Sequence, residues 1–484
     1  MRLNREKWKM SGLKRLGAVA PVHARDVRNS VWGLGFEKLD RNVFDPGKAY
    51  DKVAALGIKW IRIQSGWART ERSEGVYDFA WLDSIVDNLV VSRGLVPWIC
   101  LCYGNGIYDE AAAQVFGAVG CPPIHTEKQR RAWHDYVAAT AARYRGRVPR
   151  FEIWNEPDGR WCWKHGVNGA ETGEFTKATA AAIREGNPEA EVIGGVICCC
   201  DFGWLTDFLE TGAAASLDAF SYHSYTPDER VGLGNFRRLR ALVRRCNPEI
   251  AFIQGETGTQ SREGGAGALR EGAWTPERQA KFLARHLLVH FAQGVEINSY
   301  FSCLDMVEAL NGKVGDRGSY LDYGFFGVLG AEFDAEGRST GEYAPKLSYR
   351  TLQTLAAIFR EECAVEPLPF RFITGLHSPR IMRHDDSGEE LFTYGFRKPD
   401  GAGFVYWHPA ELLTTAGYES TVSVEFAGVE GEPVLVDLLN GEIYALPPEM
   451  AETDGKGRCK FHHLPVRDYP LLLAFGNFTG EMEK

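Results

Sequence analysis

The chain has 484 residues, which is more than one hydrophobic core usually serves, so we expect a large domain and a smaller one. Hydrophobic residues make up 44% and charged residues 25%, ordinary values for a soluble globular protein. The formal net charge of −9 argues against nucleic acid as a partner, because phosphate binding needs a basic face.

The N-terminal stretch MRLNREKWKMSGLKRLGAVAPVHA is basic but has no continuous apolar run. It lacks the pattern of a signal peptide and of a membrane-spanning segment, so we expect no membrane association. We interpret it as a solvated end, the alternative being a short basic arm that meets a partner.

Between residues 30 and 362, eight short apolar runs alternate with amphipathic, helix-like segments. The apolar runs are 30–36, 59–64, 95–101, 151–154, 191–196, 219–223, 251–254 and 296–301, and the clearest helical segments are 46–56, 79–91, 127–144 and 277–292. This alternation predicts a parallel sheet, and eight repeats fit an α/β fold, the closed (β/α)8 TIM barrel. A doubly wound open sheet is the alternative, but nothing resembles its Gly-rich phosphate turn after the first run.

After residue 362 the pattern changes to strands without intervening helices, so we expect an accessory β-sandwich over residues 363–484. Residues 434–439 and 442–446 flank Asn440-Gly441, a pair that favours the type I′ turn of a β-hairpin. We expect residues 1–29 to form an N-terminal arm that can add a strand to this sandwich.

The segment 304–345 is a long connection after the eighth run. A loop of that length in a compact domain is usually functional or disordered. Its aromatic residues, Tyr320, Tyr323, Phe325 and Phe326, argue against disorder. We expect it to cover part of the barrel mouth.

The eleven cysteines are odd in number and include no C-x-x-C pair. Cys198, Cys199 and Cys200 are adjacent, and as strand residues they would alternate faces and could not share one metal ion. We expect buried free thiols, no bound metal or cofactor, and a cytoplasmic location.

Two glutamates stand at the ends of predicted strands. Glu156 ends the fourth run in the sequence RFEIWNEPD, and Glu256 ends the seventh in QGETG. In a barrel both lie at the mouth where active sites form. Paired carboxylates there can break a glycosidic bond, one protonating the leaving oxygen and the other attacking the anomeric carbon. Burial and the negative neighbour should raise the pKa of the proton donor.

The surrounding residues fit the same chemistry. Arg62, near the end of the second run, can hydrogen-bond the nucleophile and keep it ionised, and Asn155 can bind a sugar hydroxyl beside the reacting carbon. His223 and Tyr225 lie two apart and so point to one face. Flat rings that could stack on sugars follow strand ends at Trp67, Trp161, Trp163 and Trp274.

The motif Trp154-Asn155-Glu156-Pro157 resembles the acid/base motif of the clan A retaining glycoside hydrolases. The stretch 217–225, LDAFSYHSY, is most similar to the β-xylosidase and α-L-iduronidase family, and the resemblance spans roughly residues 30–360. It implies a retaining mechanism with Glu156 as acid/base and Glu256 as nucleophile, and His223 and Tyr225 as contacts. Where clan members commonly carry Trp on the eighth strand, this chain has Phe301.

The sequence therefore predicts a retaining glycosidase acting on an oligosaccharide or small glycoside, with bulky loops that suggest exo action. The alternative is a sugar-binding protein on an inactive barrel. A metal-dependent hydrolase would need clustered His and Asp ligands, and no His-x-His pair is found. Three further acids, Glu152, Glu296 and Asp305, compete for a catalytic role, and we expect Glu152 and Glu296 to be structural.

Overall fold

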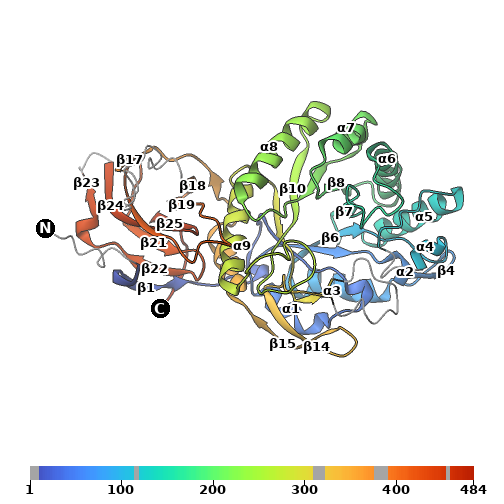
Figure 1. Ribbon diagram of the computed structural model, residues 1–484, viewed down its shortest axis with the longest axis horizontal. Coiled ribbons are helices and arrows are strands. Elements are labelled where there is room, and N and C mark those ends of the chain that lie inside the picture. The colour runs from blue at the N-terminus through green and yellow to red at the C-terminus, as the bar shows by residue number, and fades with distance from the viewer. Residues whose placement is uncertain (1–9, 114–118, 309–321, 375–390, 454–457) are drawn as a thin grey trace.

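The computed structural model describes residues 10–113, 119–308, 322–374, 391–453 and 458–484. Figure 1 shows two units side by side, a barrel ringed by helices and a β-sandwich built mainly from the C-terminal part of the chain. No helix among these residues is both long and apolar enough to span a membrane.

Eight parallel strands close into the barrel, as the sequence predicts. In chain order they are β2 (Trp32–Gly35), β3 (Trp60–Gln64), β6 (Val96–Leu101), β7 (Arg150–Ile153), β8 (Glu191–Ile197), β9 (Ala219–His223), β10 (Ala251–Thr257) and β11 (Ile297–Tyr300). The closing pair is β11 with β2, in the register Ser299 to Gly33. Each strand lies where an apolar run predicts it. The prediction of a closed barrel is confirmed, and the alternative of a doubly wound open sheet is wrong.

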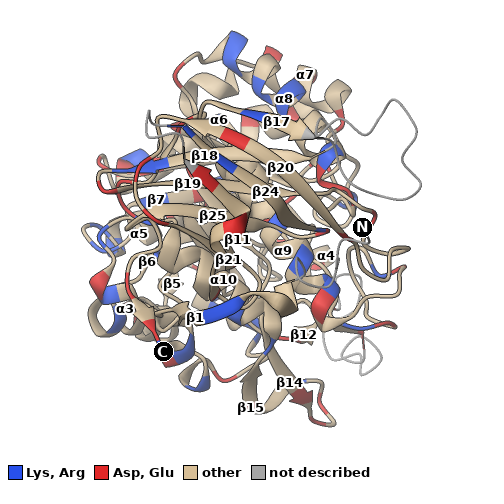
Figure 2. Ribbon diagram, turned by 90° about the vertical axis from the view of Figure 1, so that its left-hand side faces the viewer, with Lys and Arg blue, Asp and Glu red and all other residues tan. Residues whose placement is uncertain are grey.

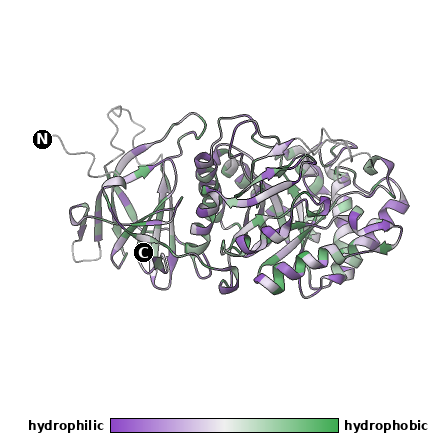
Figure 3. Cartoon of the chain, turned by 90° about the horizontal axis from the view of Figure 1, so that it is seen from below, coloured by the Kyte–Doolittle hydropathy of each residue, from purple (hydrophilic) through white to green (hydrophobic). Residues whose placement is uncertain are grey.

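Helices surround the barrel and bury one face against it. The longer ones are α3 (Ala80–Arg93), α5 (Glu127–Arg143), α6 (Gly169–Gly186), α7 (Phe202–Glu210), α8 (Glu229–Cys246), α9 (Pro276–Phe291) and α10 (Leu347–Ile358), and shorter turns are α1 (Tyr50–Ala54), α2 (Trp67–Thr70) and α4 (Glu110–Ala113). Helix α5 begins with a capping box, in which Thr126 and Gln129 satisfy each other's backbone N–H groups. Figure 3 shows polar and apolar residues alternating along these helices, as one buried face requires.

The barrel interior is layered. Strand alternation places an apolar layer low in the barrel, made of Trp98, Ile193, Ala219, Ile253 and Ile297. Arg62 and Glu152, both 0% exposed, are buried charged residues on β3 and β7, in register with Trp98 and Ile193 of the neighbouring strands. On β2 the inward position is Gly35, and a side chain there would collide with the carboxylate of Glu37 at 2.3 Å. The glycine at this position therefore leaves room for the Glu37 carboxylate.

The second unit is a sandwich of two antiparallel sheets. The larger sheet has the order β16 (Ala364–Val365), β18 (Phe392–Lys398), β19 (Gly401–Trp407), β25 (Leu471–Gly476), β21 (Pro433–Asp437), β22 (Glu442–Ala445), β1 (Lys14–Val19) and β26 (Met482–Glu483). The smaller sheet has the order β17 (Phe370–Thr374), β20 (Glu419–Ala427), β24 (Arg458–Arg467) and β23 (Ala451–Thr453). Figure 2 shows acidic and basic residues interspersed over the sandwich.

The N-terminal arm lies in this sandwich. Strand β1 pairs antiparallel with β22, Lys14 opposite Ala445, and with β26. Residues 1–9 lie outside the described residues.

The hairpin between β21 and β22 forms, but its turn differs from the prediction. The loop spans 438–441, and the N–H of Gly441 donates to the carbonyl of Asp437 at 2.8 Å. Gly441 has φ +79°, whereas Asn440 is not among the residues with positive φ. A type I′ turn needs positive φ at both central residues, so the Asn-Gly pair supplies one left-handed glycine at the end of a longer loop.

The segment after β11 contains short strands as well as loop. It forms β12 (Met306–Val307), β13 (Tyr323–Gly324), β14 (Leu329–Phe333) and β15 (Ser339–Pro345). Residues 309–321, including Tyr320, lie outside the described residues. Phe326 packs edge-on against Phe301 and Tyr225, which brings this segment to the barrel mouth.

A buried ion pair joins the two units beside α9. The guanidinium of Arg285 donates to both carboxylate oxygens of Glu229, at 2.8 and 2.6 Å, and to the backbone carbonyls of Ala410 and Asp468 in the sandwich. The indole of Trp407 donates to Glu229 at 2.9 Å. Neither charged residue exceeds 1% exposure, so each depends on the other.

We expect Glu229→Gln to lower the free energy of unfolding by about 3–5 kcal/mol, because it leaves the Arg285 charge buried without its carboxylate. Glu174→Gln is the matched control: Glu174 pairs with Lys177 at 2.7 Å, but its side chain is 66% exposed. The control should cost less than about 1 kcal/mol. Urea unfolding curves measure both, and equal small losses would contradict the assigned role.

Candidate active site

Arg62 on β3 is the centre of the polar layer at the barrel mouth. Its Nη1 donates to Glu256 at 2.8 Å and to Glu37 at 3.3 Å, and its Nη2 donates to the Asn155 side-chain oxygen at 2.8 Å. Its Nε donates to Glu152 at 2.9 Å. A buried guanidinium requires such partners, and here they come from three strands or strand ends, those of β2, β7 and β10.

Glu156 is placed by an unusual turn at the end of β7. Trp154 and Glu156 have φ +64° and +46°, left-handed conformations that are uncommon without glycine and cluster at functional sites. The turn is anchored by the N–H of Trp154 donating to Leu101 and that of Glu156 donating to Val196, both at 3.1 Å. These contacts explain why the strand ends in polar residues: the turn aims Asn155 and Glu156 into the mouth.

Glu256 is placed by a bulge in β10. The register with β9 shifts between Gln254 and Glu256. A side chain on the intervening Gly255 would lie 2.4 Å from the Ser221 hydroxyl oxygen, so only glycine fits. Bulges re-aim side chains, and this one directs Glu256 toward Arg62.

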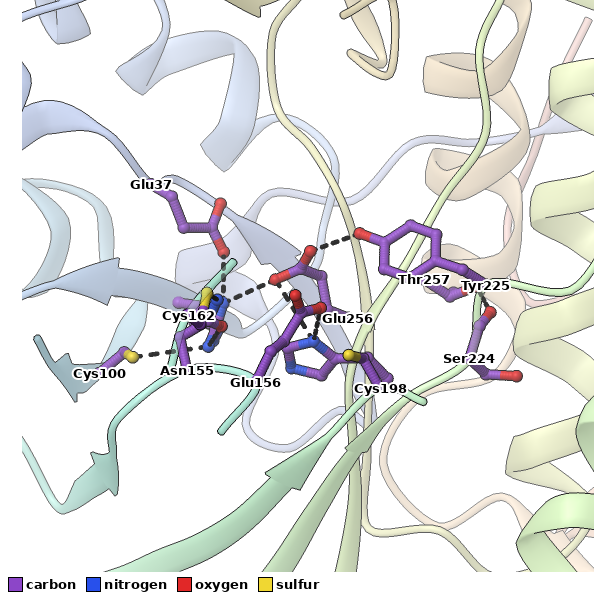
Figure 4. Close-up of polar contacts among 12 residues, drawn as sticks. Glu37, Cys100, Asn155, Glu156, Cys162, Cys198, Ser224, Tyr225, Glu256 and Thr257 are labelled. Atoms are coloured by element: carbon purple, nitrogen blue, oxygen red, sulfur yellow. Dashed lines mark hydrogen bonds and ion pairs between the residues drawn. The ribbon is translucent and has the colours of Figure 1, made fainter. Parts of the chain in front are cut away.

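The two glutamates face each other, as Figure 4 shows. One carboxylate oxygen of each, and a ring nitrogen of His223, lie within 4.8 Å of one another. His223 Nδ1 lies 2.8 Å from Glu156 and 3.8 Å from Glu256. The Tyr225 hydroxyl donates to the other oxygen of Glu256. The carboxylates are thus close enough to act on one bond from opposite sides.

The protonation of Glu156 differs from the prediction of a raised pKa. Burial raises the pKa of Glu156, but hydrogen bonds from His223 and Trp161 and the charge of Arg62 outweigh it, so that the pKa lies below its ordinary value. For His223, burial lowers the pKa, but the charge of Glu256 and the bond to Glu156 raise it overall. When the pair holds one proton, that proton therefore resides mainly on His223.

Glu37 is a site residue that the sequence reasoning missed. It follows β2 directly, is 1% exposed and shares Arg62 with Glu256. Burial raises the pKa of Glu37 to about 7, with the negative charge of Glu256 adding to the effect. Its Oε2 accepts no hydrogen bond from any described residue. The sequence feature that could have identified Glu37 is an acidic residue directly after the first predicted strand.

Lys38 and Glu308 form a second missed pair. The Lys38 ammonium donates to Glu308 at 3.0 Å and to the Val307 carbonyl at 2.9 Å, linking the loop after β2 to the segment after β11. The ammonium also lies 5.5 Å from the ring centroid of Phe301. Phe301 is 7% exposed and packs beneath this pair. The pair therefore ties the loop after β2 to the segment after β11.

The predicted aromatic contacts divide into two groups. The Trp161 indole donates to Glu156, so this ring lies at the site. Trp67, Trp163 and Trp274 are at most 2% exposed. Their indole N–H groups donate to Glu71, Glu171 and the Leu269 carbonyl respectively. The prediction of sugar stacking is therefore wrong for Trp67, Trp163 and Trp274, because packing in the loops and helices covers both faces of each ring.

The competing acids have structural partners. Glu152 accepts from Arg62 and from the Trp98 indole, the latter at 3.3 Å. Glu296 pairs with Arg150. Asp305 pairs with Lys346 at 2.6 Å and accepts the N–H of Gly327 at 2.9 Å. All three acids therefore have hydrogen-bond or ion-pair partners within the protein.

All eleven cysteines are free thiols, but not all are buried. Cys198–Cys200 follow β8 rather than forming part of it, because the strand ends at Ile197. Cys199 and Cys246 are exposed. The prediction that the triplet alternates across a buried strand is wrong.

The chain resembles known glycosidases in sequence. Residues 49–235 match the family model "Glycosyl hydrolases family 39". A β-xylosidase of Geobacillus stearothermophilus is 29% identical over 161 residues, an alignment that covers 31% of this chain and 31% of that protein. The chain thus matches less than a third of this curated relative's length.

Solved structures share the fold. A family 39 glycoside hydrolase from Bacteroides cellulosilyticus WH2 superimposes with a TM-score of 0.59 and 17% identity, over 92% of this chain and 80% of that one. A monomeric β-xylosidase from Caulobacter crescentus CB15 has a TM-score of 0.59 and 16% identity, over 96% and 98%. The TIM barrel with its antiparallel sheets is therefore an architecture found among family 39 enzymes.

We expect Glu37→Gln to become more stable relative to wild type as the pH rises. The pKa of Glu37 is raised to about 7 in the folded protein. The folded state therefore binds the proton more tightly than the unfolded state, and the stability that Glu37 contributes is present at acid pH and lost as the pH rises through 7. The gain of the variant over wild type between pH 5 and pH 8 should be on the order of 2 kcal/mol.

Urea unfolding at pH 5, 6.5 and 8 measures this change. Glu263→Gln is the control, because Glu263 is an exposed glutamate in the loop after β10. A difference between Glu37→Gln and wild type that stays constant with pH would contradict the raised pKa.

Proposed function

We propose that the chain is a retaining glycoside hydrolase that works by double displacement through Glu256 and Glu156. The observation that carries the proposal is that one carboxylate oxygen of Glu156 lies within 4.8 Å of one carboxylate oxygen of Glu256, which fits a closely spaced pair. Retaining enzymes hold the pair about 5–5.5 Å apart, whereas inverting enzymes need ~6.5–9.5 Å to admit a water molecule. The sequence similarity to family 39 supports the same reaction.

In the first step, Glu256 attacks the anomeric carbon as its bond to the leaving oxygen breaks. Arg62 and Tyr225 hold the two oxygens of Glu256 and so fix the direction of attack. Glu156 gives its proton to the leaving oxygen. The Glu156–His223 pair holds this one proton, which moves from His223 Nδ1 to Glu156 across 2.8 Å before Glu156 passes it to the leaving oxygen. The first step therefore leaves Glu156 as a carboxylate and His223 neutral.

In the second step, Glu156 takes a proton from water as the water oxygen attacks the anomeric carbon. The bond to Glu256 breaks, the sugar leaves with retained configuration, and the proton on Glu156 restores the starting state. The opposite placement of Glu156 and Glu256 serves both steps without movement of either residue.

We propose exo action on a β-xyloside-like substrate. The Lys38–Glu308 pair links the loop after β2 to the segment after β11, and we expect this link to block a continuous sugar chain on that side. The buried polar atoms of Glu37 and Asn155 lie on this side, where sugar hydroxyls need partners. The relative named a β-xylosidase supports the choice of glycone.

We expect Glu256→Ala to abolish hydrolysis of every aryl glycoside, because no nucleophile remains. Glu156→Ala should lower kcat/KM about 10²–10⁴-fold for a poor leaving group and far less for 2,4-dinitrophenol, which departs without a proton. The test is a panel of β-xyloside, β-glucoside, β-galactoside, β-glucuronide and α-L-arabinoside, with Glu263→Gln as a control of wild-type activity. Binding of glycosides without turnover by wild type would favour a sugar-binding protein instead.

The pH dependence of kcat/KM tests whether Glu156 and His223 share a proton. Because the pKa of His223 is raised above its usual 6.5, kcat/KM for a substrate with a poor leaving group should fall only above pH 6.5, as the pair loses its proton. Glu156→Ala acting on the 2,4-dinitrophenyl glycoside should lack this fall. A basic limb that persists in the variant would assign the ionisation to another group.

A further inference from the structure

Two loops beside the active site bring together the side chains that bind transition metals. Asp109 precedes α4, Cys121 and His125 precede α5, and His165 lies between β7 and α6. A carboxylate oxygen of Asp109, the Cys121 sulfur and a ring nitrogen of His165 lie within 4.8 Å of one another. The His125 ring lies edge-on to the His165 ring, with centroids 4.1 Å apart.

One oxygen of Asp109 has no partner in the described part of the chain. Its Oδ1 accepts the N–H of Ala111 at 2.9 Å and so caps α4, but Oδ2 is buried and accepts no hydrogen bond from these residues. The His165 ring Nε2 lies 3.9 Å away, and burial lowers the pKa of His165, so this ring favours the neutral form that binds metal ions. A buried carboxylate oxygen without a partner is costly, and a cation among these ligands removes the cost.

The types of ligand atom at this site indicate which metal ion it would bind. One thiol, two imidazoles and one carboxylate match the tetrahedral sulfur, nitrogen and oxygen ligation of Zn²⁺ and not the all-oxygen sets of Ca²⁺ or Mg²⁺. In a tetrahedral zinc site, donor atoms are roughly 3.3–3.8 Å apart. The donor atoms of Asp109, Cys121 and His165 lie within 4.8 Å of one another, whereas the neighbouring His125 ring lies outside this group and must turn to bring a nitrogen to the ion. Both histidines are exposed, which provides a path for the ion.

We propose that Asp109, Cys121, His125 and His165 bind one zinc ion that braces the two loops framing the barrel mouth. The loops already touch: the N–H of Lys164 donates to the Gly120 carbonyl at 2.8 Å. Gly120, with φ +86°, allows this approach, since a side chain there would lie 2.5 Å from the Trp161 carbonyl. The ion would thus hold the loop whose Trp161 donates to Glu156, a structural role distinct from the proposed hydrolysis.

A second thiol cluster, Asp158 with Cys198 and Cys199, is less suited to a metal. Both oxygens of Asp158 already accept backbone N–H groups, from Cys198 at 2.9 Å and from Cys199 at 2.8 Å. Its two thiols also come from adjacent residues, 3.6 Å apart. This cluster supplies the matched control, a cysteine near the mouth that should not bind the ion.

The test is a titration of chelator-stripped full-length protein with Co²⁺, followed by the visible bands of tetrahedral cobalt and the thiolate-to-cobalt charge-transfer band. Saturation at one equivalent, with displacement by Zn²⁺, is the expected result. Zinc should also raise the temperature of thermal unfolding by a few degrees. Burial, with the charge of Asp109, raises the pKa of the Cys121 thiol to about 11, so binding should release a proton and tighten with increasing pH.

Cys121→Ser should remove the charge-transfer band and weaken Co²⁺ binding more than about 100-fold. Asp109→Asn keeps the cap on Ala111, because asparagine also caps helices, and should weaken binding without unfolding α4. Cys199→Ser should bind as wild type does. No binding by wild type, or a band lost in Cys199→Ser and kept in Cys121→Ser, would overturn the proposal. Either result is independent of hydrolysis, so this proposal and the proposed function fail separately.

Discussion

A buried guanidinium at the centre of a barrel constrains everything around it. Arg62 is 0% exposed, and its donors face Glu37, Glu152, Glu256 and Asn155. Removing one partner would leave charge in a low-dielectric interior, so each partner must be held in place. The local features at the mouth follow from that need: the left-handed turn through Glu156, the bulge at Gly255, and the empty inward position at Gly35.

The same site contains more carboxylates than cations. Arg62 is shared among Glu37, Glu152 and Glu256, while Glu156 turns to His223. Burial of so much negative charge is relieved by protons, one on the Glu156–His223 pair and, up to about pH 7, one on Glu37. A proton shared by Glu156 and His223 therefore offsets part of the negative charge at the mouth. A lone acid would hold a proton only if burial raised its pKa. Here Glu156 shares the proton with His223 instead.

The sequence carried most of the architecture because the barrel is built from repeated local patterns. Short apolar runs between helical segments located all eight strands, and the prediction placed Arg62 near the end of the second run. Glu156 and Glu256 were recognisable because acids at the ends of two strands of a barrel meet at one mouth. The aromatic residues were not predictable in the same way: a Trp after a strand can point to the site, as Trp161 does, or pack into a loop, as Trp67 and Trp163 do. Only tertiary packing separates these cases.

The residues that distinguish this mouth come from segments without a repeating pattern. Glu37 and Lys38 lie in the turn after β2, and Glu308 lies next to residues that are not described. No spacing in the sequence links Lys38 to Glu308, 270 positions away, or Asp109 to His165. Such pairings depend on loop closure over the barrel, where each loop is fixed by its anchoring strands and by its neighbours. The barrel strands therefore determine where the mouth lies, and the residues of the turns that follow them determine its shape and charge.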